Sequence, residues 1–237
     1  MNPAPDPASP RKVRVLLVDD SAVMRSLLRM VLEPQPFIEI IAAAASGEAG
    51  LAAFQSLHPD LVLLDIEMPG MNGLEVLSAI RRSDRRVPVI MCSTLTSRGA
   101  RITVEALTRG ATDYVTKPGA QNGIREGVET LTRELLPKIL ALFPQKARLS
   151  VAPPSPEPHP AEPRPTLPPS ASLPPKMVVI GTSTGGPAAL ELVLPKIPAG
   201  FPLPILIVQH MPRLFTGLLA ERLNSLCPLH VSEAAPD

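Results

Sequence analysis

Short apolar runs alternate along residues 13–142 with stretches whose apolar side chains recur every three or four positions. Runs such as LVLL and VPVIM have no polar alternation, which is typical of strands buried on both faces of a parallel sheet. We therefore predict five strand–helix units that form a doubly wound α/β domain. The predicted strands cover residues 13–18, 38–42, 61–64, 87–92 and 114–116, and the predicted helices cover residues 22–32, 48–57, 74–81, 102–109 and 124–142.

The strand–helix pattern resumes near the C-terminus. Residues 176–181 form a strand-like apolar run, residues 187–194 are predicted to be helical, and PILIVQ is a second buried-strand run. These elements predict part of another parallel-sheet α/β domain. Because a segment of roughly 60 residues is small for an independent core, we expect it to leave a sheet edge and apolar helix faces uncovered.

A proline-rich segment separates the two patterns. Prolines with Ser, Ala and Glu cannot form strand ladders or bury a core, so we predict a linker at residues 144–175. It would keep two domains near each other without fixing their contact. The predicted organisation is a disordered tail at residues 1–11, a first domain at 12–143, the linker, and a partial second domain at 176–237.

Charge and cysteine content narrow the class of protein. The formal net charge of +1 provides no broad attraction for nucleic acid or anionic membranes, and no basic helix-turn-helix pattern follows the linker. The two cysteines form no CxxC pair, which suggests reduced thiols. The N-terminus has no apolar signal core, and the apolar runs are too short to cross a bilayer. We expect a cytoplasmic protein without membrane insertion or nucleic-acid partners.

Five polar residues follow the strands of the first domain: Asp19, Asp20, Asp65, Ser93 and Lys117. In a doubly wound sheet, ligands gather at the carboxyl ends of the strands. Three carboxylates at one edge would repel each other without a cation, and this donor set suits a hard ion such as Mg²⁺. The hydroxyl and the ammonium group could then hold phosphoryl oxygens. Each aspartate alone is also consistent with a helix cap, but five such residues together favour a functional site.

The segments VLLVDDSAVMR, LVLLDIEMPGMNGLE, VIMCST and GATDYVTKP resemble the signature segments of response-regulator receiver domains. This resemblance implies a flavodoxin-like (βα)5 fold. It also implies that Asp65 accepts a phosphoryl group from a histidine kinase. Asp20, Asp65 and the backbone carbonyl of Glu67 would hold Mg²⁺, and Asp19 would act at one remove.

The receiver resemblance also assigns the remaining strand-end residues. Ser93 and Tyr114 match the hydroxyl and aromatic residues of the family's conformational switch, and Lys117 matches its phosphoryl-contacting lysine. Serine in place of the commoner threonine at position 93 leaves the hydroxyl role intact.

A GxSxG sequence at residues 181–185 joins the first strand of the second domain to its helix. This strand–turn–helix elbow exposes a serine hydroxyl, here that of Ser183, and the helix start offers N–H groups to an oxyanion. His210 follows the second strand and would lie beside Ser183 if the two strands are neighbours. From these residues alone, Ser183 is a nucleophile or a helix cap, and His210 is a general base or a packed strand-end side chain.

The segments IGTSTGGP and IVQHMP resemble the catalytic domain of chemotaxis protein-glutamate methylesterases, a family that also joins a receiver to this domain through a linker. The resemblance implies that Ser183 attacks the γ-methyl ester of a chemoreceptor glutamate, with His210 as general base and acid and no cofactor. Thr184 would help shape the oxyanion site, and the same site would deamidate receptor glutamines. The family further implies that the unphosphorylated receiver packs over the Ser183 cleft.

The chain departs from the family in two ways. Thr182 stands where alanine is common, and the family's triad aspartate comes well downstream of the histidine. None of the local acids Glu191, Glu221, Glu233 and Asp237 matches that aspartate. We therefore expect a methylesterase truncated within its catalytic domain, with Ser183 nearly idle. The alternative function is a catalytically inactive receiver protein that accepts phosphoryl groups or binds the kinase.

Overall fold

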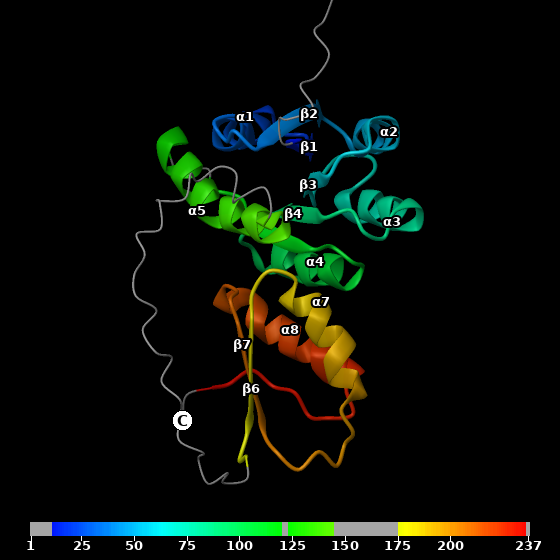
Figure 1. Ribbon diagram of the computed structural model, residues 1–237, viewed down its shortest axis with the longest axis vertical. Helices are drawn as coiled ribbons and strands as arrows, with labels where there is room; N and C mark the ends of the chain where they lie inside the picture. The colour runs from blue at the N-terminus through cyan, green and yellow to red at the C-terminus, as the bar shows by residue number, and fades with distance from the viewer. Residues whose placement is uncertain (1–10, 120–122, 145–174, 236–237) are drawn as a thin grey trace, which may run out of the picture.

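The computed structural model describes residues 11–119, 123–144 and 175–235. Residues 11–144 form the first unit, in which five strands alternate with five helices (Figure 1). Its strands are β1 (Val13–Val18), β2 (Ile38–Ala44), β3 (Leu61–Asp65), β4 (Val89–Ser93) and β5 (Asp113–Thr116), and its helices are α1 (Ala22–Leu32), α2 (Gly47–Leu57), α3 (Gly73–Ser83), α4 (Ser97–Thr108) and α5 (Ile124–Leu142).

All neighbouring strands of the first unit are parallel, and their order is β2-β1-β3-β4-β5. Helices α1 and α5 cover one face of the sheet, and α2, α3 and α4 cover the other. Successive residues of β1 point to opposite faces, so that Val15 and Leu17 belong to one apolar cluster while Leu16 and Val18 belong to the other. The predicted doubly wound α/β fold is therefore confirmed.

The start of α4 differs most from the sequence prediction. The helix begins at Ser97, whereas its apolar periodicity becomes evident only from Ile102. Thr96 caps the helix because its side chain accepts a hydrogen bond from the backbone N–H of Gly99. The polar first turn therefore belongs to the helix although its sequence is typical of a loop.

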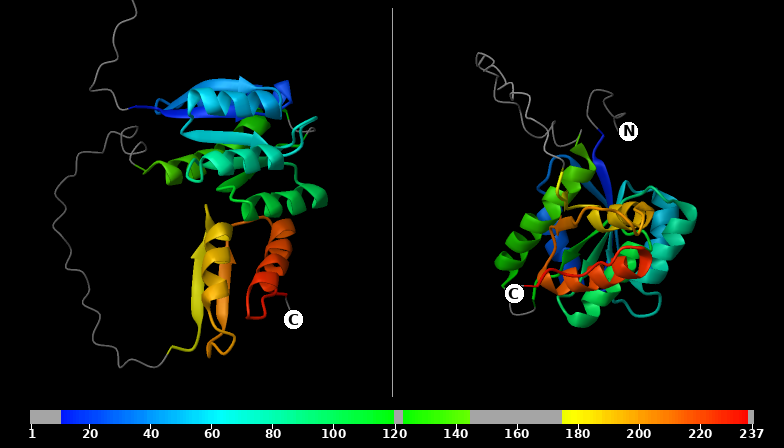
Figure 2. Two further views of the ribbon diagram at one scale, coloured as in Figure 1. Left: turned by 90° about the vertical axis from the view of Figure 1, so that its right-hand side faces the viewer. Right: turned by 90° about the horizontal axis from the view of Figure 1, so that it is seen from below.

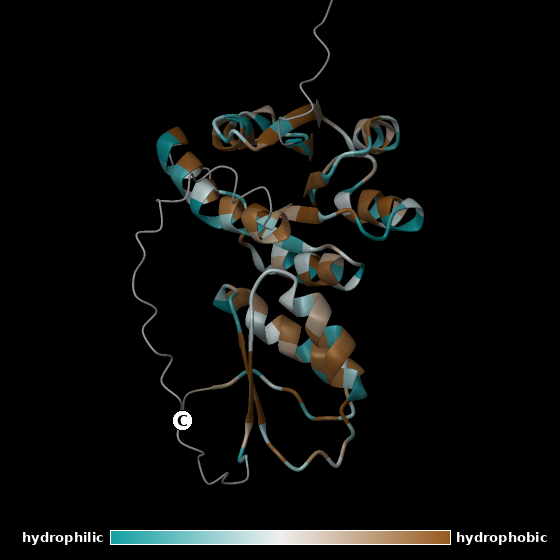
Figure 3. Cartoon of the chain, viewed as in Figure 1, coloured by the Kyte–Doolittle hydropathy of each residue, from teal (hydrophilic) through white to brown (hydrophobic). Residues whose placement is uncertain are grey.

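The second unit, residues 175–235, is a two-stranded parallel sheet with helices on one side. It contains β6 (Val178–Thr182), α7 (Gly186–Val193), the short 3₁₀ helix η1 (Leu194–Lys196), β7 (Ile205–Gln209) and α8 (Arg213–Leu226). Ile180 and Ile207 pack towards the core that α7 and α8 form. Val179, Leu206 and Val208 point the other way and are 48–59% exposed. Figure 3 shows these strands as largely hydrophobic.

Helix α4 joins the two units. It packs against both α7 and α8, so the second unit lies directly beneath the α4 edge of the first (Figures 1 and 2). Phe215 of α8 is fully buried in the apolar cluster of the first unit, together with Tyr114. The predicted linker falls almost entirely within residues 145–174, and the predicted tail within residues 1–10, both outside the described residues. In the described parts of the chain, no helix has the length and apolar character needed to cross a bilayer.

Candidate functional site

Two buried carboxylates lie at the carboxyl ends of neighbouring strands. Asp65 ends β3, and Asp19 follows β1, which pairs with β3 in parallel up to Val18 and Leu64. Asp19 is 1% exposed and Asp65 is 2% exposed, whereas Asp20 is open to solvent. One oxygen atom from each of these three aspartates can be chosen so that all three atoms lie within 4.8 Å of one another.

Lys117 joins the two buried carboxylates. Its Nζ lies 2.9 Å from Asp19 Oδ2 and 2.7 Å from Asp65 Oδ1. The lysine is held beside the sheet because its backbone N–H donates to the carbonyl of Ser93, which extends the ladder between β4 and β5. Burial alone would lower the pKa of the Lys117 ammonium, but hydrogen bonds and charge interactions with the two carboxylates raise it above its usual value. Lysine therefore stays charged in this site.

Burial raises the pKa of Asp65 to about 6, and the nearby Lys117 limits the rise. Its Oδ1 accepts hydrogen bonds from Lys117 and from the Glu67 backbone N–H at 3.3 Å. Its Oδ2 is buried and has no hydrogen-bond partner in the described chain. A buried carboxylate oxygen without a partner is costly unless a ligand uses it.

The carboxylates of Asp19, Asp20 and Asp65 fit a magnesium ion. Mg²⁺ prefers oxygen ligands and is usually bound through one or two carboxylates, waters and phosphate oxygens. The three aspartates bring such oxygens together, and the unpartnered Asp65 Oδ2 is available to an electrophile or a cation. Glu67, whose backbone carbonyl was predicted as a ligand, lies on the loop that follows β3.

Ser93 lies at the end of β4, as predicted, but its hydroxyl bonds to helix α4. It is 1% exposed and accepts a hydrogen bond from Thr103 Oγ1 at 2.6 Å. It also lies 3.3 Å from the carbonyl oxygens of Thr94 and Gly99. Among the described residues, the Ser93 hydroxyl makes no hydrogen bond to Asp65 or to Lys117. Sequence analysis missed Thr103, because a threonine inside a predicted helix carries no signal of a buried side-chain partner.

Tyr114 of β5 is buried where the two units meet. Its ring stacks on that of Phe215, with centroids 4.9 Å apart and an angle of 16° between the ring planes. Lys138 of α5 lies 4.9 Å from the tyrosine ring centroid and pairs with Asp113 at 2.8 Å. Phe215 was also missed by sequence analysis, because its partner lies about 100 residues away in another unit.

The parallel pairing of β6 with β7 brings Ser183 and His210 together. Each follows the last residue of its strand, and these last residues, Thr182 and Gln209, are register partners. Ser183 Oγ lies 3.5 Å from His210 Nδ1, and both side chains are exposed. This distance is longer than that of an ordinary hydrogen bond, but such contacts are often long in the absence of substrate. Thr184 lies half-buried in the turn between β6 and α7.

Gln209 fixes the turn that carries Ser183. Its side chain accepts a hydrogen bond from Thr182 Oγ1 at 2.7 Å and donates one to the Ser183 carbonyl at 3.1 Å. Gly185 adopts a left-handed conformation with φ of 75°, which glycine tolerates best. A side chain on Gly186 would overlap Gln209, so the turn needs glycine there as well. Sequence analysis treated Gln209 only as part of a strand.

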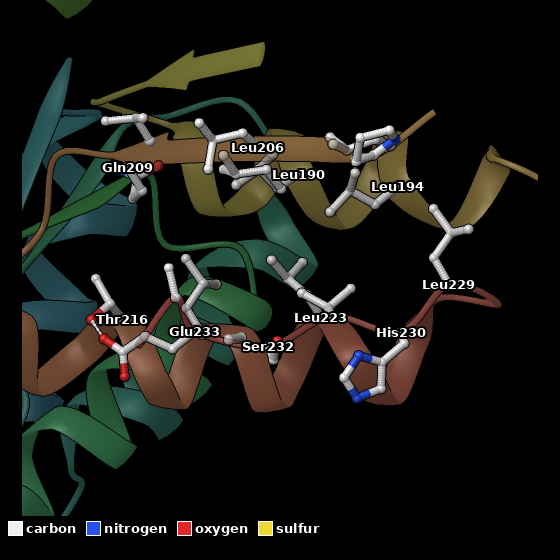
Figure 4. Close-up of a pocket in the computed structure, with 18 of the residues that line it drawn as sticks. Leu190, Leu194, Leu206, Gln209, Thr216, Leu223, Leu229, His230, Ser232 and Glu233 are labelled. Atoms are coloured by element: carbon white, nitrogen blue, oxygen red, sulfur yellow. Dashed lines mark hydrogen bonds between the residues drawn. The ribbon is translucent and has the colours of Figure 1, made fainter. Parts of the chain in front are cut away.

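The described part of the second unit contains two pockets. One, of about 590 Å³, is lined by Ser183, His210 and their neighbours. The other, of about 660 Å³, lies between β7 and α8 and is largely apolar (Figure 4). Leu190 and Leu194 line one side of this cavity, while Leu223 and Glu233 line the other. Neither Ser183 nor His210 lines it, so the larger cavity is separate from the candidate nucleophile.

Each of the two units matches the model of a known protein family. The family model of the response regulator receiver domain matches residues 15–129, and that of the CheB methylesterase matches residues 178–237. The crystal structure of the response regulator domain of Thermotoga maritima CheB is 38% identical, with a TM-score of 0.48, and covers 57% of this chain and 96% of that one.

Curated relatives match across both units. The protein-glutamate methylesterase/protein-glutamine glutaminase of Trichodesmium erythraeum (strain IMS101) is 43% identical over 223 residues, which cover 94% of this chain and 63% of the relative. The protein of the same name from Alkalilimnicola ehrlichii (strain ATCC BAA-1101 / DSM 17681 / MLHE-1) is 40% identical over 269 residues and is 67% covered. The chain therefore spans less than two thirds of the length of the first relative and about two thirds of the length of the second.

Proposed function

Because the chain belongs to the protein-glutamate methylesterase/protein-glutamine glutaminase family, we propose that it is a chemotaxis response regulator whose phosphorylation controls hydrolysis at Ser183. In this proposal, residues 12–143 form the receiver domain and residues 176–237 form the N-terminal part of the methylesterase domain. The observation that carries the proposal is the presence in one chain of a buried carboxylate–lysine site and a serine–histidine pair.

Asp65 is the proposed phosphoryl acceptor. Its carboxylate oxygen attacks the phosphorus of a phosphohistidine on the kinase, the P–N bond breaks, and an acyl phosphate forms. The buried and unpartnered Oδ2 supports this role, because it is free to react. Lys117, which now bonds Asp65 and Asp19, would move its ammonium towards a phosphoryl oxygen. Asp20, Asp65 and the Glu67 carbonyl would hold Mg²⁺, with Asp19 at one remove, and the ion would neutralise phosphoryl charge.

Ser183 and His210 are the proposed catalytic residues of the hydrolase. The Ser183 hydroxyl attacks the carbonyl carbon of a receptor glutamate γ-methyl ester while His210 accepts its proton. His210 then donates the proton to the methoxide oxygen as the ester C–O bond breaks, which releases methanol, and water hydrolyses the acyl-enzyme to release glutamate. A glutamine side chain would lose ammonia by the same route. The turn at Thr184 would contribute to the oxyanion site.

We further propose that docking of the receiver restricts access to Ser183. Met211, the residue after His210, packs against the apolar cluster of the first unit. Thr108 of α4 donates a hydrogen bond of 3.0 Å to Glu191 of α7, the helix that follows the serine turn. Elements on both sides of the catalytic pair therefore contact the receiver, and phosphorylation would weaken these contacts.

The length of the Ser183–His210 contact favours a second candidate function, in which the chain accepts phosphoryl groups without hydrolysing esters. At 3.5 Å the pair is loosely aligned, and in the described chain the imidazole makes no other hydrogen bond. An orienting carboxylate is worth about 10⁴-fold in a serine protease triad, so a loose pair would be slow.

Methanol release from membranes that carry methylated chemoreceptors tests the proposal. The chain should release methanol in the presence of acetyl phosphate and Mg²⁺, and Ser183→Ala should not. Thr216→Ala, which alters an exposed hydroxyl contact outside the turn, serves as a matched control and should keep the activity. Release that persists in Ser183→Ala would exclude Ser183 as the nucleophile. Phosphorylation of Asp65 without any Ser183-dependent release would support the second candidate.

A further inference from the structure

A buried cluster of hydroxyls links the end of β4 to the first turns of α4. Ser93 Oγ, Thr103 Oγ1 and the Gly99 carbonyl oxygen form a triangle with distances of 2.6, 2.7 and 3.3 Å. Both side chains are at most 1% exposed, so water does not replace these contacts. The close approach depends on Gly99, because a side chain there would lie 2.4 Å from the Thr94 carbonyl oxygen.

The hydroxyls of Ser93 and Thr103 differ in the hydrogen-bond acceptors that each has besides the other. Each hydroxyl has one proton to donate. The Thr103 hydroxyl lies 2.6 Å from Ser93 Oγ and 2.7 Å from the Gly99 carbonyl oxygen of the preceding helical turn, so its single proton can go to Gly99 when Ser93 turns away. Ser93, in contrast, has only two long alternatives at 3.3 Å. Its short contact with Thr103 is therefore the bond that is lost when Ser93 turns away.

This bond lies on the helix that connects the two units. Thr103 belongs to α4, which packs on α7 and α8 and carries the Thr108–Glu191 contact. In the proposed function, the Ser93 hydroxyl turns towards the phosphoryl group on Asp65. That movement removes one of the contacts by which β4 holds α4 in the position where α4 packs on α7 and α8.

We infer that Thr103 is a positioning residue that holds the Ser93 hydroxyl on α4 and so opposes the phosphorylated conformation. The inference rests on the proposed phosphorylation of Asp65. When only a fraction of molecules has the binding-competent conformation, the apparent affinity for a ligand falls by that fraction. Removing the Thr103 hydroxyl should enlarge the fraction of molecules in which Ser93 is free to face the phosphoryl site.

Titration of the full chain with beryllium trifluoride and Mg²⁺, which mimic a phosphoryl group on aspartate, tests this role. Tyr114 is the only tyrosine in a chain without tryptophan, so intrinsic fluorescence reports on the surroundings of this ring, which include its stack with Phe215. Thr103→Val keeps a β-branched shape but lacks the hydroxyl. It should lower the half-saturating concentration by about two- to tenfold, the worth of one hydrogen bond. Thr103→Ser keeps the hydroxyl and should titrate like the wild type.

Two further variants, Ser93→Ala and Asp65→Asn, distinguish this positioning role from a purely structural one. In Ser93→Ala, Thr103→Val should leave the half-saturating concentration unchanged, because the hydroxyl that Thr103 holds is absent. A shift that persists in Ser93→Ala, or an unshifted titration of Thr103→Val, would overturn the inference. Asp65→Asn should not respond at all. If the wild type itself shows neither a fluorescence change nor a rise in melting temperature, the proposed phosphorylation is wrong and the inference falls with it. Thr103→Ala replaces Thr103→Val if the valine variant does not fold.

Discussion

Tyr114 of β5 and Phe215 of α8 stack with ring centroids 4.9 Å apart, and this contact connects the two units. Both side chains are buried, although they belong to units with separate sheets. Tyr114 is also the residue that the receiver resemblance identifies as the switch aromatic. A movement of this ring in the first unit would therefore disturb the packing of the second unit directly.

We predict that Phe215→Ala separates the two units. The substitution removes a fully buried ring that stacks on Tyr114 of the first unit, and such a change typically costs about 3–5 kcal/mol in a core. Small-angle X-ray scattering should show a larger radius of gyration, and acrylamide should quench Tyr114 fluorescence more strongly. Leu214→Ala, which alters the adjacent and 41% exposed residue of α8, should change neither measurement. An unchanged radius of gyration in Phe215→Ala would mean that other contacts hold the units together.

We predict that Asp65 is the only phosphorylation site. Its buried carboxylate at the end of β3 contacts Lys117 and faces two further carboxylates, and its Oδ2 has no hydrogen-bond partner in the described chain. Incubation with acetyl phosphate and Mg²⁺ should add a single phosphoryl group by intact-mass spectrometry, and Asp65→Asn should abolish the addition. Asp60→Asn removes a carboxylate on the same unit that pairs with the Arg11 side chain and accepts a hydrogen bond from the Arg14 backbone N–H, and it should leave the addition intact. Label that remains in Asp65→Asn would contradict the assignment.

We predict that Lys117→Met destabilises the fold and makes it depend on Mg²⁺. Removing the ammonium leaves Asp19 and Asp65 buried without a compensating cation, and breaking a buried ion pair in this way costs about 3–5 kcal/mol. The free energy of unfolding in urea should fall by this order in EDTA. Millimolar Mg²⁺ should restore part of the loss, and more than it adds to the wild type. Lys12→Met, which alters an exposed lysine, provides the control. Equal Mg²⁺ effects on both variants would argue against a cation site at these carboxylates.

The sequence predicted the first unit well because its signals are local. Short, largely apolar runs identified all five strands, and the predicted bounds of β1, α1 and α5 agree with the structure. Parallel topology then brought Asp19, Asp65 and Lys117 to one edge, as expected from strand ends alone. The same logic placed His210 beside Ser183, because β6 and β7 are neighbours.

Contacts between distant segments could not be predicted in this way. Nothing local to Phe215 indicates that it is buried in another unit, and nothing local to Thr103 indicates a bond to Ser93. The polar first turn of α4 hid the start of that helix. We also expected apolar helix faces to be uncovered in the second unit. Helices α7 and α8 pack part of their surface on α4, but Leu192 and Val193 of α7 are 67% and 51% exposed. The outer face of the small sheet is exposed as well.

We predict that this outer sheet face promotes self-association. Val179, Leu206 and Val208 are 48–59% exposed on adjacent parallel strands, and contiguous exposed apolar surface favours association. The double substitution Val179→Thr and Val208→Thr keeps the β-branched shape of both residues and makes the face more polar. Sedimentation velocity at increasing protein concentration should show less association for this variant. Val23→Thr alters a 67% exposed valine on the other unit and should have no effect.

The last prediction concerns the turn that carries Ser183. A β-carbon on Gly186 would lie 2.1 Å from Gln209 Oε1 and 2.8 Å from Thr182 Cβ, and the second of these atoms cannot move aside easily. Gly186→Ala should therefore push Gln209 out of its bonds to Thr182 and to the Ser183 carbonyl. The loss of these two hydrogen bonds should lower the free energy of unfolding by about 1–3 kcal/mol.

The catalytic consequence should be larger than the loss of stability. Gln209 holds the Ser183 carbonyl, and a displacement of about 1 Å at a reacting group can cost on the order of 100-fold in rate. The labelling of Ser183 by a fluorophosphonate should slow by up to this factor in Gly186→Ala, and Ser183→Ala should not be labelled. Gly181→Ala is the matched control for stability, because nothing lies within 4 Å of the added carbon. If Gly186→Ala labels as fast as the wild type while losing stability, Gln209 supports the fold of the turn without positioning its serine.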